Sequence, residues 1–458
     1  MLGIHRSYNG EAAVHYFKQA LSKEDNYYMD QDVEALWEGK ASLRLGLHGK
    51  KVTQEFFKYL VNNINPDTKE RLTVRNADNR RAGFDLTFSA PKSISVMYAT
   101  TKDPNVLEAH RAAYRAAMLE IEASMQTQAN TKYGRFYEDT GNIIYAAFDH
   151  FTSRPNETQK NGEAIFVPDP QMHTHCYIPN ITWNDNKNRY QALEMGNVHT
   201  LAPYFEAVYH AHLSHGLNQI RLLTRRTLER YEIEGVSQEI IDKFSNRTKL
   251  IHAVAKGKGI TDPKEIAKLG ALTRHSKNKS VDENELYGLW KERLSNVEYK
   301  ALETIKGNYK ETQRPLSVKE AIDRSLEYFL ERNSAAQEKR VLAFALKLGY
   351  GHLLPKDVKE ELDSRENILR SKVDTITNIT TKEMVAFENE MIELATRGKG
   401  KFIPLNSTYE PKQNYLNNEQ RKAINKILSS PDQVTILNGA AGSGKTSLLT
   451  EVKEGIIL

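Results

Sequence analysis

The chain has 458 residues, 27% of them charged, and a formal net charge of +5. This length supports about two to four domains, and so small a basic excess restricts any binding of nucleic acid to local patches. The lone cysteine, Cys176, excludes an internal disulfide. The absence of a signal peptide and of a long apolar run predicts a cytoplasmic protein without membrane insertion.

The polar N-terminal segment contains three tyrosines that could carry chemistry, Tyr16, Tyr27 and Tyr28. A phenol becomes a nucleophile when it is deprotonated beside a metal-bound electrophile. Core packing and surface stacking are the alternatives for each tyrosine, and these residues alone do not decide between them.

Two alternating apolar runs follow and predict strands between about Asp85 and Ala99, interrupted by Ser89-Ala90-Pro91. An aspartate inside a strand is costly to bury unless it is paired or hydrogen-bonded. Asp85 is therefore either exposed, or it orients a histidine or accepts a tyrosine proton.

A helix is expected from about Val106 to Gln128, followed by strands from Asn142 to His150 and from Met172 to Thr182. Between these two strands the polar segment Asn156–Glu163 predicts a surface turn, inserted without moving the strand ends.

Two histidines stand two residues apart in the second of these strands, so His173 and His175 point to the same face. With His150 they offer three neutral imidazoles, a set that can bind one divalent metal and leave positions open, as catalytic sites do. Simple packing of the pair is the alternative. Cys176 lies on the opposite strand face and is assigned to packing.

Several ordered motifs then identify a family. The N-terminal tyrosines are followed by the blocks Asp85-Leu-Thr-Phe-Ser-Ala-Pro-Lys-Ser93, His150-Phe-Thr-Ser-Arg154 and Gln171-Met-His-Thr-His175. In this order they resemble the MobF-type conjugative relaxases, relaxase-helicases that nick plasmid DNA at the origin of transfer. Four shorter segments fit the same resemblance: Trp37-Glu-Gly-Lys40, Leu45-Gly-Leu47, Phe244-Ser-Asn-Arg-Thr248 and Thr273-Arg-His-Ser-Lys277.

The resemblance implies an α+β fold over residues 1–310, in which an antiparallel palm of the HUH relaxase type carries helical additions. In this family a tyrosine attacks the scissile phosphate, which leaves a 5′-phosphotyrosyl link and a free 3′-hydroxyl. Asp85 would orient a histidine or assist proton removal, Tyr16 would cut first, and Tyr27 or Tyr28 would serve the second transesterification. The residues implied to hold a divalent metal (Mg, Mn or Zn) are His150, His173 and His175.

The implied partners are single-stranded origin-of-transfer DNA with a hairpin, accessory relaxosome proteins and a type IV secretion coupling protein, and the family travels to the recipient with its DNA. The basic stretch Arg221–Arg230 with Lys249, Lys256 and Lys258 could bind DNA or be a solvated helix face. Two other functions remain open: a rolling-circle replication initiator or transposase of the HUH class, and a non-catalytic nucleic-acid-binding protein.

The segments after the palm are predicted to be mostly helical. Ala202–Gly216 is expected to be a helix with His212 and His215 one turn apart, but no cysteine or carboxylate stands near enough to predict zinc binding. Residues 311–410 predict a helical connector or the start of a helicase N-terminal region, with Ser317 as an N-cap. Lys399–Lys412 predicts a linker.

A phosphate-binding motif, Gly439–Thr446, follows an expected strand at Val434–Asn438 and precedes a helix. Glycine amides can wrap phosphates, the lysine reaches the β and γ phosphates, and the threonine binds magnesium. Upstream, one glutamine resembles the adenine reader of superfamily 1 helicases. The residues assigned to the nucleotide are Gln420, Gly439, Gly444, Lys445 and Thr446.

Only 12 residues follow Thr446, too few for a Walker B carboxylate and an arginine finger. Residues 411–458 are therefore expected to be the truncated start of a P-loop helicase domain. ATP and magnesium would be cofactors of a full-length helicase only.

Overall fold

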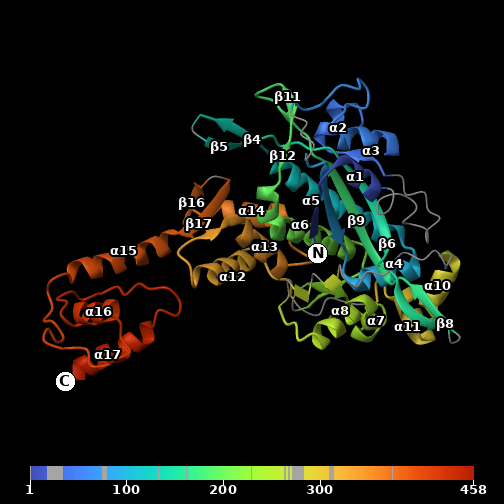
Figure 1. Cartoon of the computed structure of the whole chain (residues 1–458). Helices are drawn as coiled ribbons and strands as arrows, with labels where there is room; N and C mark the ends of the chain where they lie inside the picture. The colour runs from blue at the N-terminus through green and yellow to red at the C-terminus, as the bar shows by residue number, and fades with distance from the viewer. Residues whose placement is uncertain are drawn as a thin grey trace. The chain divides into compact units, whose positions relative to one another are not determined.

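The computed structural model describes residues 2–17, 35–74, 80–132, 134–160, 163–227, 230–262, 265–266, 269–270, 283–308, 314–373 and 375–457. These residues form two compact units (Figure 1). The first comprises residues 1–331, 336–365 and 372–378, and the second comprises residues 332–335, 366–371 and 379–458.

A five-stranded antiparallel sheet in the order β1-β3-β9-β6-β2 is the centre of the first unit (Figure 1). Its strands are β1 (Leu2–Ser7), β3 (Gly83–Ser89), β9 (Pro170–Pro179), β6 (Tyr145–Thr152) and β2 (Trp37–Glu38). Nearly all of β6 is buried, so both faces of the sheet are covered by other elements. The sheet confirms the prediction of a mixed helix–strand fold built on antiparallel strands.

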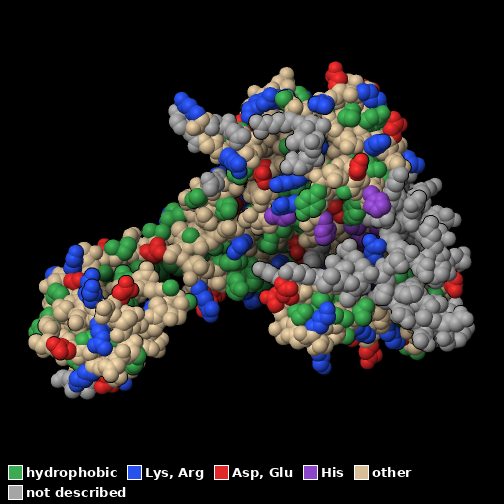
Figure 2. All heavy atoms as spheres, in the orientation of Figure 1, with side chains coloured by type: hydrophobic (Ala, Val, Ile, Leu, Met, Phe, Trp, Pro, Cys, Tyr) green, Lys and Arg blue, Asp and Glu red, His purple; other side chains and the backbone are tan. Residues whose placement is uncertain are grey.

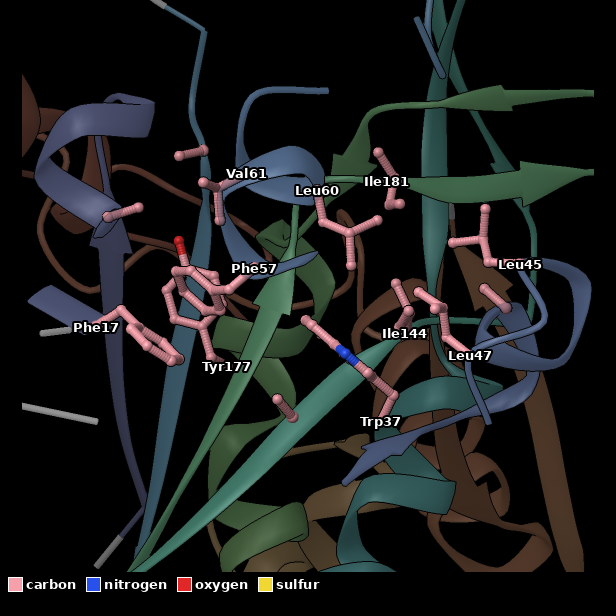
Figure 3. Close-up of a cluster of buried hydrophobic side chains, with 14 of the residues drawn as sticks. Phe17, Trp37, Leu45, Leu47, Phe57, Leu60, Val61, Ile144, Tyr177 and Ile181 are labelled. Atoms are coloured by element: carbon pink, nitrogen blue, oxygen red, sulfur yellow. The ribbon is translucent and has the colours of Figure 1, made fainter. Parts of the chain in front are cut away.

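One face of the sheet is covered by the N-terminal helices α1 (Gly10–Tyr16), α2 (Lys40–Arg44) and α3 (Gln54–Val61). Their apolar side chains meet those of β6 and β9 in one aromatic-rich cluster, shown in Figure 3. Phe57 lies at the centre of it, with ring centroids 4.5 Å from Phe17 and 4.8 Å from Tyr177. This packing holds α1 on the sheet.

The opposite face packs against two long helices, α5 (Pro104–Ala123) and α6 (Gly196–Gln219). Helix α5 starts at a proline preceded by an aspartate cap, a sequence that favours a helix start. Phe88 on β3 contacts Tyr114 of α5 and Tyr209 of α6. The helices therefore cover the sheet opposite the N-terminal cluster.

Short hairpins and helices complete the first unit. The further strands are β4 (Gln126–Thr131), β5 (Gly134–Asp139), β7 (Asn156–Lys160), β8 (Glu163–Val167), β10 (Thr182–Asn184), β11 (Arg189–Gln191), β12 (Leu193–Glu194), β13 (Thr224–Arg226) and β14 (Tyr231–Ile233). The further helices are α4 (Lys92–Thr101), α7 (Gln238–Lys243), α8 (Asn246–Gly257), α10 (Glu283–Glu292), α11 (Asn296–Thr304), α12 (Val318–Leu330), α13 (Glu338–Leu348) and α14 (Pro355–Asp363). No helix among the described residues has the length and apolarity that crossing a membrane requires.

The second unit contains the C-terminal helices α15 (Lys382–Arg397), α16 (Asn418–Leu428) and α17 (Lys445–Ile457). Helices α16 and α17 share a small apolar core that includes Ile424, Leu428 and Leu448. Three short strands fall around the division between the units: β15 (Ala336–Gln337), β16 (Ile368–Val373) and β17 (Ile376–Thr381). Residues 399–412 contain no helix or strand, but the prediction that they form a linker is wrong, because they pack within the second unit: Tyr409 is buried in the same apolar core and donates to Glu451 at 3.0 Å.

Two predictions around the third strand and the first long helix are wrong. The run after Pro91 forms helix α4 rather than a strand. Its alternation of serine with apolar residues does not mark an exposed face, because Ser93 and Ser95 are buried and their hydroxyls accept from the Ile233 and Met172 amides. Helix α5 ends at Ala123 rather than near Gln128, because Ser124 turns back to bond Glu120 and the next residues pair as β4.

Two further predictions of local structure are wrong, whereas one is confirmed. The expected turn at Asn156–Glu163 belongs to a hairpin of β7 and β8, inserted between β6 and β9; polar composition alone does not exclude a two-stranded hairpin. Val434–Asn438 is irregular, because no described strand of the second unit pairs with it, and Ile436 is 87% exposed. Ser317 does cap α12, with Glu320 completing a capping box.

Candidate active site

Three histidines converge on the face of the sheet that the N-terminal helices cover. His150 of β6 lies directly opposite His173 of β9 in the strand register, and His175 is two residues further along β9. Residues opposite each other in antiparallel strands share a face, as do residues two apart. One potential ligand atom from each ring lies within 4.8 Å of the other two.

The hydrogen bonds of these rings suit a metal site. Nδ1 of His173 lies 2.9 Å from the Gln171 carbonyl, and since a carbonyl only accepts, Nδ1 carries the hydrogen and Nε2 keeps a lone pair. Nδ1 of His175 donates in the same way to Asp85 Oδ2 at 2.7 Å. Nε2 of His150 is buried with no hydrogen-bond partner among the described residues. Such a buried polar atom is costly unless a ligand satisfies it, so these residues fit a divalent metal.

Burial also keeps two of the rings in the form that binds metal. It lowers the pKa of His173 to about 3, with the neighbouring His175 adding to the effect. It also lowers the pKa of His150 well below the ordinary value, and His175, His173 and Arg154 add to this effect. Both imidazoles are therefore neutral near pH 7, as metal ligation requires.

Tyr16 and Asp85 complete the site. The Tyr16 hydroxyl donates to Asp85 Oδ2 at 2.6 Å, and it lies 3.4 Å from His175 Nδ1. Burial alone would raise the pKa of Asp85, but His175 and the Tyr16 hydroxyl more than offset it, so this pKa lies below its ordinary value. Asp85 is therefore a carboxylate that accepts from both the phenol and the imidazole.

Helix α1 delivers Tyr16 to this position. Asn9 caps the helix by accepting from the Ala12 amide at 2.7 Å, and Phe17, the next residue after Tyr16, is buried in the aromatic cluster (Figure 3). The Tyr16 ring is edge-on to His175 with centroids 6.3 Å apart. Its hydroxyl is thus held by packing on one side and by Asp85 on the other.

One residue of the site escaped the sequence analysis. Thr87 lies opposite His175 in the register of β3 and β9, and its hydroxyl is 3.2 Å from His175 Nδ1. Two-residue spacing from Asp85 on a strand was the signal that could have found it.

The other predicted residues have varied outcomes. Tyr27, Tyr28 and Thr273–Lys277 lie outside the described residues. His215 lies 2.9 Å from Gln219 rather than in a group with cysteine or carboxylate ligands. Cys176 is buried, as expected of a packing residue.

The basic stretch Arg221–Arg230, for which DNA binding and a solvated helix face were both open, is partly engaged within the protein. Arg230 pairs with Glu206 at 3.2 Å, and Arg225 donates to the Val236 carbonyl.

A basic cleft that the sequence analysis did not single out lies beside the hairpin of β10 and β11. Its volume is about 690 Å³, and its lining includes Arg80, Arg81, Lys187, Arg189 and Tyr190. Lys and Arg side chains recur on this part of the first unit in Figure 2. The two basic residues Lys187 and Arg189 next to Tyr190 were the available signal.

In the second unit, the predicted nucleotide residues lie where the glycine loop meets helices α16 and α17. Lys445 Nζ donates to the carbonyls of Gly439 and Ala440 at 2.6 and 2.9 Å. Gln420 Nε2 donates to the Ser443 carbonyl at 3.0 Å, and a side chain at Gly444, whose φ is +76°, would collide with that same amide. Thr446 follows as the second residue of α17.

Comparisons with known proteins identify related chains. Residues 10–297 match the family model of the TrwC relaxase, and residues 415–457 match that of an AAA domain. Two multifunctional conjugation proteins TraI are similar, one from Escherichia coli strain K12 at 30% identity over 53% of this chain, and one from Escherichia coli at 34% over 36%. The matched segments span only 12% and 9% of those relatives' own lengths.

Solved structures extend the comparison to the fold. A metal-bound structure of the conjugative relaxase TrwC with oriT DNA has a TM-score of 0.55 and 27% identity, and covers 64% of this chain and 97% of its own. TrwC with a 27-mer DNA comprising the recognition hairpin and the cleavage site has a TM-score of 0.53 and 26% identity, with the same coverage. Because the family model matches more than half of the residues, the chain belongs to the TrwC relaxase family.

Proposed function

We propose that this chain nicks one strand of DNA at an origin of transfer and becomes joined to the new 5′ end through Tyr16. The observation that carries the proposal is the Tyr16 hydroxyl, hydrogen-bonded to Asp85 on the same sheet face as the three histidines. The TrwC structures bound to oriT DNA favour a transfer origin over the replication initiators and transposases that use similar residues.

The reaction begins at the phenol. Asp85 takes the Tyr16 proton through the hydrogen bond that joins them, and the phenol oxygen forms a bond to phosphorus. The bond from phosphorus to the 3′ oxygen breaks, and that oxygen leaves as a 3′-hydroxyl after taking a proton from water, while Asp85 returns the Tyr16 proton to solvent. Since the phosphodiester is exchanged rather than hydrolysed, the 3′-hydroxyl can attack phosphotyrosine later and reseal the strand without ATP. Tyr27 or Tyr28 is proposed to serve the second transesterification.

The three histidines are proposed to hold the divalent metal, whose charge would offset the charge that gathers on the non-bridging phosphate oxygens. His175 is tied to Asp85, and His173 to the Gln171 carbonyl, so the protein fixes the orientation of two rings before DNA arrives. Preorganisation of this kind avoids reorganisation during the reaction. The identity of the metal, Mg, Mn or Zn, is left to experiment.

The single-stranded DNA and its hairpin are proposed to use basic surfaces of the first unit. The cleft beside β10 and β11 offers Arg81 and Arg189 to phosphates and Tyr190 to a base or sugar. Arg80 bonds the carbonyls of Val61 and Asn180, and Lys187 pairs with Glu138, so these two residues shape the cleft. Accessory relaxosome proteins and a secretion coupling protein are expected partners of this function. A protein that acts on plasmid DNA works in the donor cytoplasm, and a covalent link to the transferred strand would carry it to the recipient.

We propose three functional segments: residues 1–310 for nicking, residues 311–410 as a connector or the start of a helicase region, and residues 411–458 for part of a nucleotide site. The match of residues 415–457 to an AAA domain supports the last assignment. Gln420 would read adenine, and the loop ending in Lys445 and Thr446 would hold phosphates. These 458 residues by themselves are proposed not to hydrolyse ATP.

Trapping the covalent product tests the proposed function directly. Single-stranded fragments of the DNA that flanks the gene are incubated with the chain and a divalent metal, and complexes that survive denaturation are collected. After protease digestion, sequencing gives the nick site, and mass spectrometry gives the modified tyrosine. One recurrent 5′ end attached to Tyr16 supports the proposal, whereas no adduct with any fragment would leave a non-catalytic DNA-binding protein. A recurrent end at a replication origin or an element terminus would favour the rival HUH functions.

A further inference from the structure

A chain of buried polar side chains lies on the sheet face opposite the metal histidines. Thr174 lies between His173 and His175 on β9, and it faces Asp149, the neighbour of His150 on β6, in the strand register. Because strand side chains alternate, these two residues point away from the metal toward α5 and α6. His110 of α5 and Tyr209 of α6 extend the chain.

The direction of each hydrogen bond in this chain follows from the groups present. The Thr174 hydroxyl lies 2.6 Å from Asp149 Oδ1, and a carboxylate only accepts, so Thr174 donates its one hydrogen there. His110 Nε2, at 2.7 Å from the same hydroxyl, must then donate to it. The tautomer leaves His110 Nδ1 as the acceptor from the Tyr209 hydroxyl at 2.8 Å.

The chain is closed and buried. Arg111 Nε holds the second Asp149 oxygen at 2.8 Å. Thr174 and His110 have no exposed surface, and Asp149 is 4% exposed. Burial lowers the pKa of His110 to about 4, so this ring is neutral near pH 7 and keeps the tautomer that the hydrogen bonds demand. A fully satisfied buried network of this kind gives its members one defined arrangement.

We propose that Thr174 and Asp149 are positioning residues for the metal site, which lock strands β6 and β9 at the register that brings the three histidines together. The inference rests on the proposed metal-dependent function. The bond between the Thr174 hydroxyl and the Asp149 carboxylate joins β6 and β9 at the same level as the three histidines. Its loss would let the two strands shift or rotate relative to each other, which would move the histidine rings apart. Partners that bond a metal ligand directly typically account for about 10- to 100-fold in metal affinity, and Thr174 and Asp149, which act through the strands that carry the ligands, are expected to have an effect at the lower end of that range.

The test compares three threonine variants of the full chain. Thr174→Val removes the hydroxyl and keeps the shape, Thr174→Ser restores the hydroxyl, and Thr182→Val is the matched control. Thr182 is equally buried and also bonds a neighbour through its hydroxyl, the Asn142 carbonyl at 2.8 Å, but it does not flank a ligand. Affinity for Zn²⁺ is measured without DNA by competition with a chromophoric chelator, and Co²⁺ absorption reports the coordination geometry.

We expect Thr174→Val to weaken Zn²⁺ binding about tenfold, the lower end of the range for partners that bond a ligand directly, and to alter the Co²⁺ spectrum, with Thr174→Ser within about threefold of the wild type. Thr182→Val should lower the melting temperature without changing metal affinity. If Thr174→Val does not fold, Asp149→Asn tests the proposal instead. This variant keeps the side-chain volume, but its amide NH2 replaces one of the two oxygens that accept from Thr174 and Arg111. We expect it to weaken Zn²⁺ binding about tenfold.

Wild-type Zn²⁺ affinity and Co²⁺ spectrum in folded Thr174→Val, or in Asp149→Asn where that variant decides, would overturn the positioning role. In that outcome the proposed nicking activity can still stand, since it is measured separately with DNA. A wild-type chain that binds no metal at all would overturn both proposals.

Discussion

The sheet site and the glycine loop differ in what holds their functional side chains in place. At the sheet, Tyr16, Asp85 and the histidines are fixed by strand register, by an aromatic cluster and by hydrogen bonds to one another. In the loop of the second unit, Lys445 bonds the carbonyls of its own turn, and the preceding residues form no strand, with Ile436 exposed. A motif therefore predicts the residues of a site, whereas its surroundings decide whether they are organised for chemistry.

The largest expected effect is at the sheet site, where Tyr16 is the proposed nucleophile. Tyr16→Phe removes the nucleophilic oxygen but keeps the ring that packs beside His175, so we expect the first covalent adduct to fall by at least about 10³-fold with the fold unchanged. Gel assays of denatured complexes measure the adduct. Tyr8→Phe is the matched control, because Tyr8 is 73% exposed and should nick normally.

Separate variants test which tyrosine performs the first cleavage and which the second. Tyr27→Phe and Tyr28→Phe should leave the first adduct almost unchanged and slow the second transesterification. Wild-type phosphopeptides that carry the DNA on Tyr27 or Tyr28 would contradict the assignment of Tyr16 as the first nucleophile.

Removal of one metal ligand should abolish most of the nicking activity while leaving DNA affinity nearly unchanged. His173→Ala is expected to lose metal binding and to reduce nicking by about 10³-fold or more, with DNA affinity within about tenfold, because affinity is spread over many phosphate contacts. Calorimetry gives the metal affinity, and fluorescence anisotropy gives the DNA affinity. The control is His252→Ala on α8, an exposed histidine outside the site. Nicking by His173→Ala in the presence of a chelator would refute the metal role.

The packing around the sheet also predicts a pH dependence of stability. Lys92 donates to the Pro170 carbonyl at the start of β9, and burial lowers its pKa to about 8 from the ordinary 10.5, although Asp169 and Glu232 act in the opposite direction. Between pH 8 and 10.5 the unfolded chain therefore binds more protons at Lys92 than the folded chain does, so this residue makes stability rise with pH across that window. Below pH 8 the cost of burying the charge is fully present.

Lys92→Met should remove that rise, which is roughly 1–3 kcal/mol. Urea unfolding at pH 7.5 and pH 10 measures it, followed by the fluorescence of the three tryptophans, which all lie in the first unit. Lys58→Met, at an exposed lysine, should keep the wild-type difference between the two pH values. A Lys92→Met chain with that same difference would show that the charge of Lys92 is not desolvated.

The part of the sheet site that could be predicted from sequence is the part set by local geometry. Two-residue spacing places His173 and His175 on one strand face, but no spacing gives the register that sets His150 opposite His173. Tyr16 was assigned by family resemblance, because its approach to Asp85 depends on how α1 packs. Thr87 was missed for a similar reason, since its contact with His175 crosses between strands.

The same limit explains the errors elsewhere. Helix α4 was predicted to be a strand because serine alternates with apolar residues after Pro91. In the structure Ser93–Tyr98 are all buried, so this alternation does not separate a buried face from an exposed one. The strand expected at Val434–Asn438 was inferred from composition, which cannot supply the neighbouring strands that a buried parallel strand requires. In both places, long-range packing rather than local sequence decides the structure.

The smallest effect is expected at the glycine loop. Lys445→Ala should leave nicking unchanged, because no step of the proposed transesterification uses Lys445 and the nucleophile, base and metal ligands all belong to the first unit. In the wild-type chain Lys445 is satisfied by Gly439 and Ala440, so nucleotide must displace these bonds before the lysine can reach a phosphate. We therefore expect weak ATP binding at most, lost in Lys445→Ala, and no DNA-stimulated phosphate release from these 458 residues, since hydrolysis also needs a carboxylate and an arginine. Filter binding with labelled ATP measures nucleotide binding, and a phosphate-release assay with and without DNA measures hydrolysis. DNA-stimulated release that disappears in Lys445→Ala would mean that the loop is already organised for catalysis, although the residues before it form no strand and Ile436 is exposed.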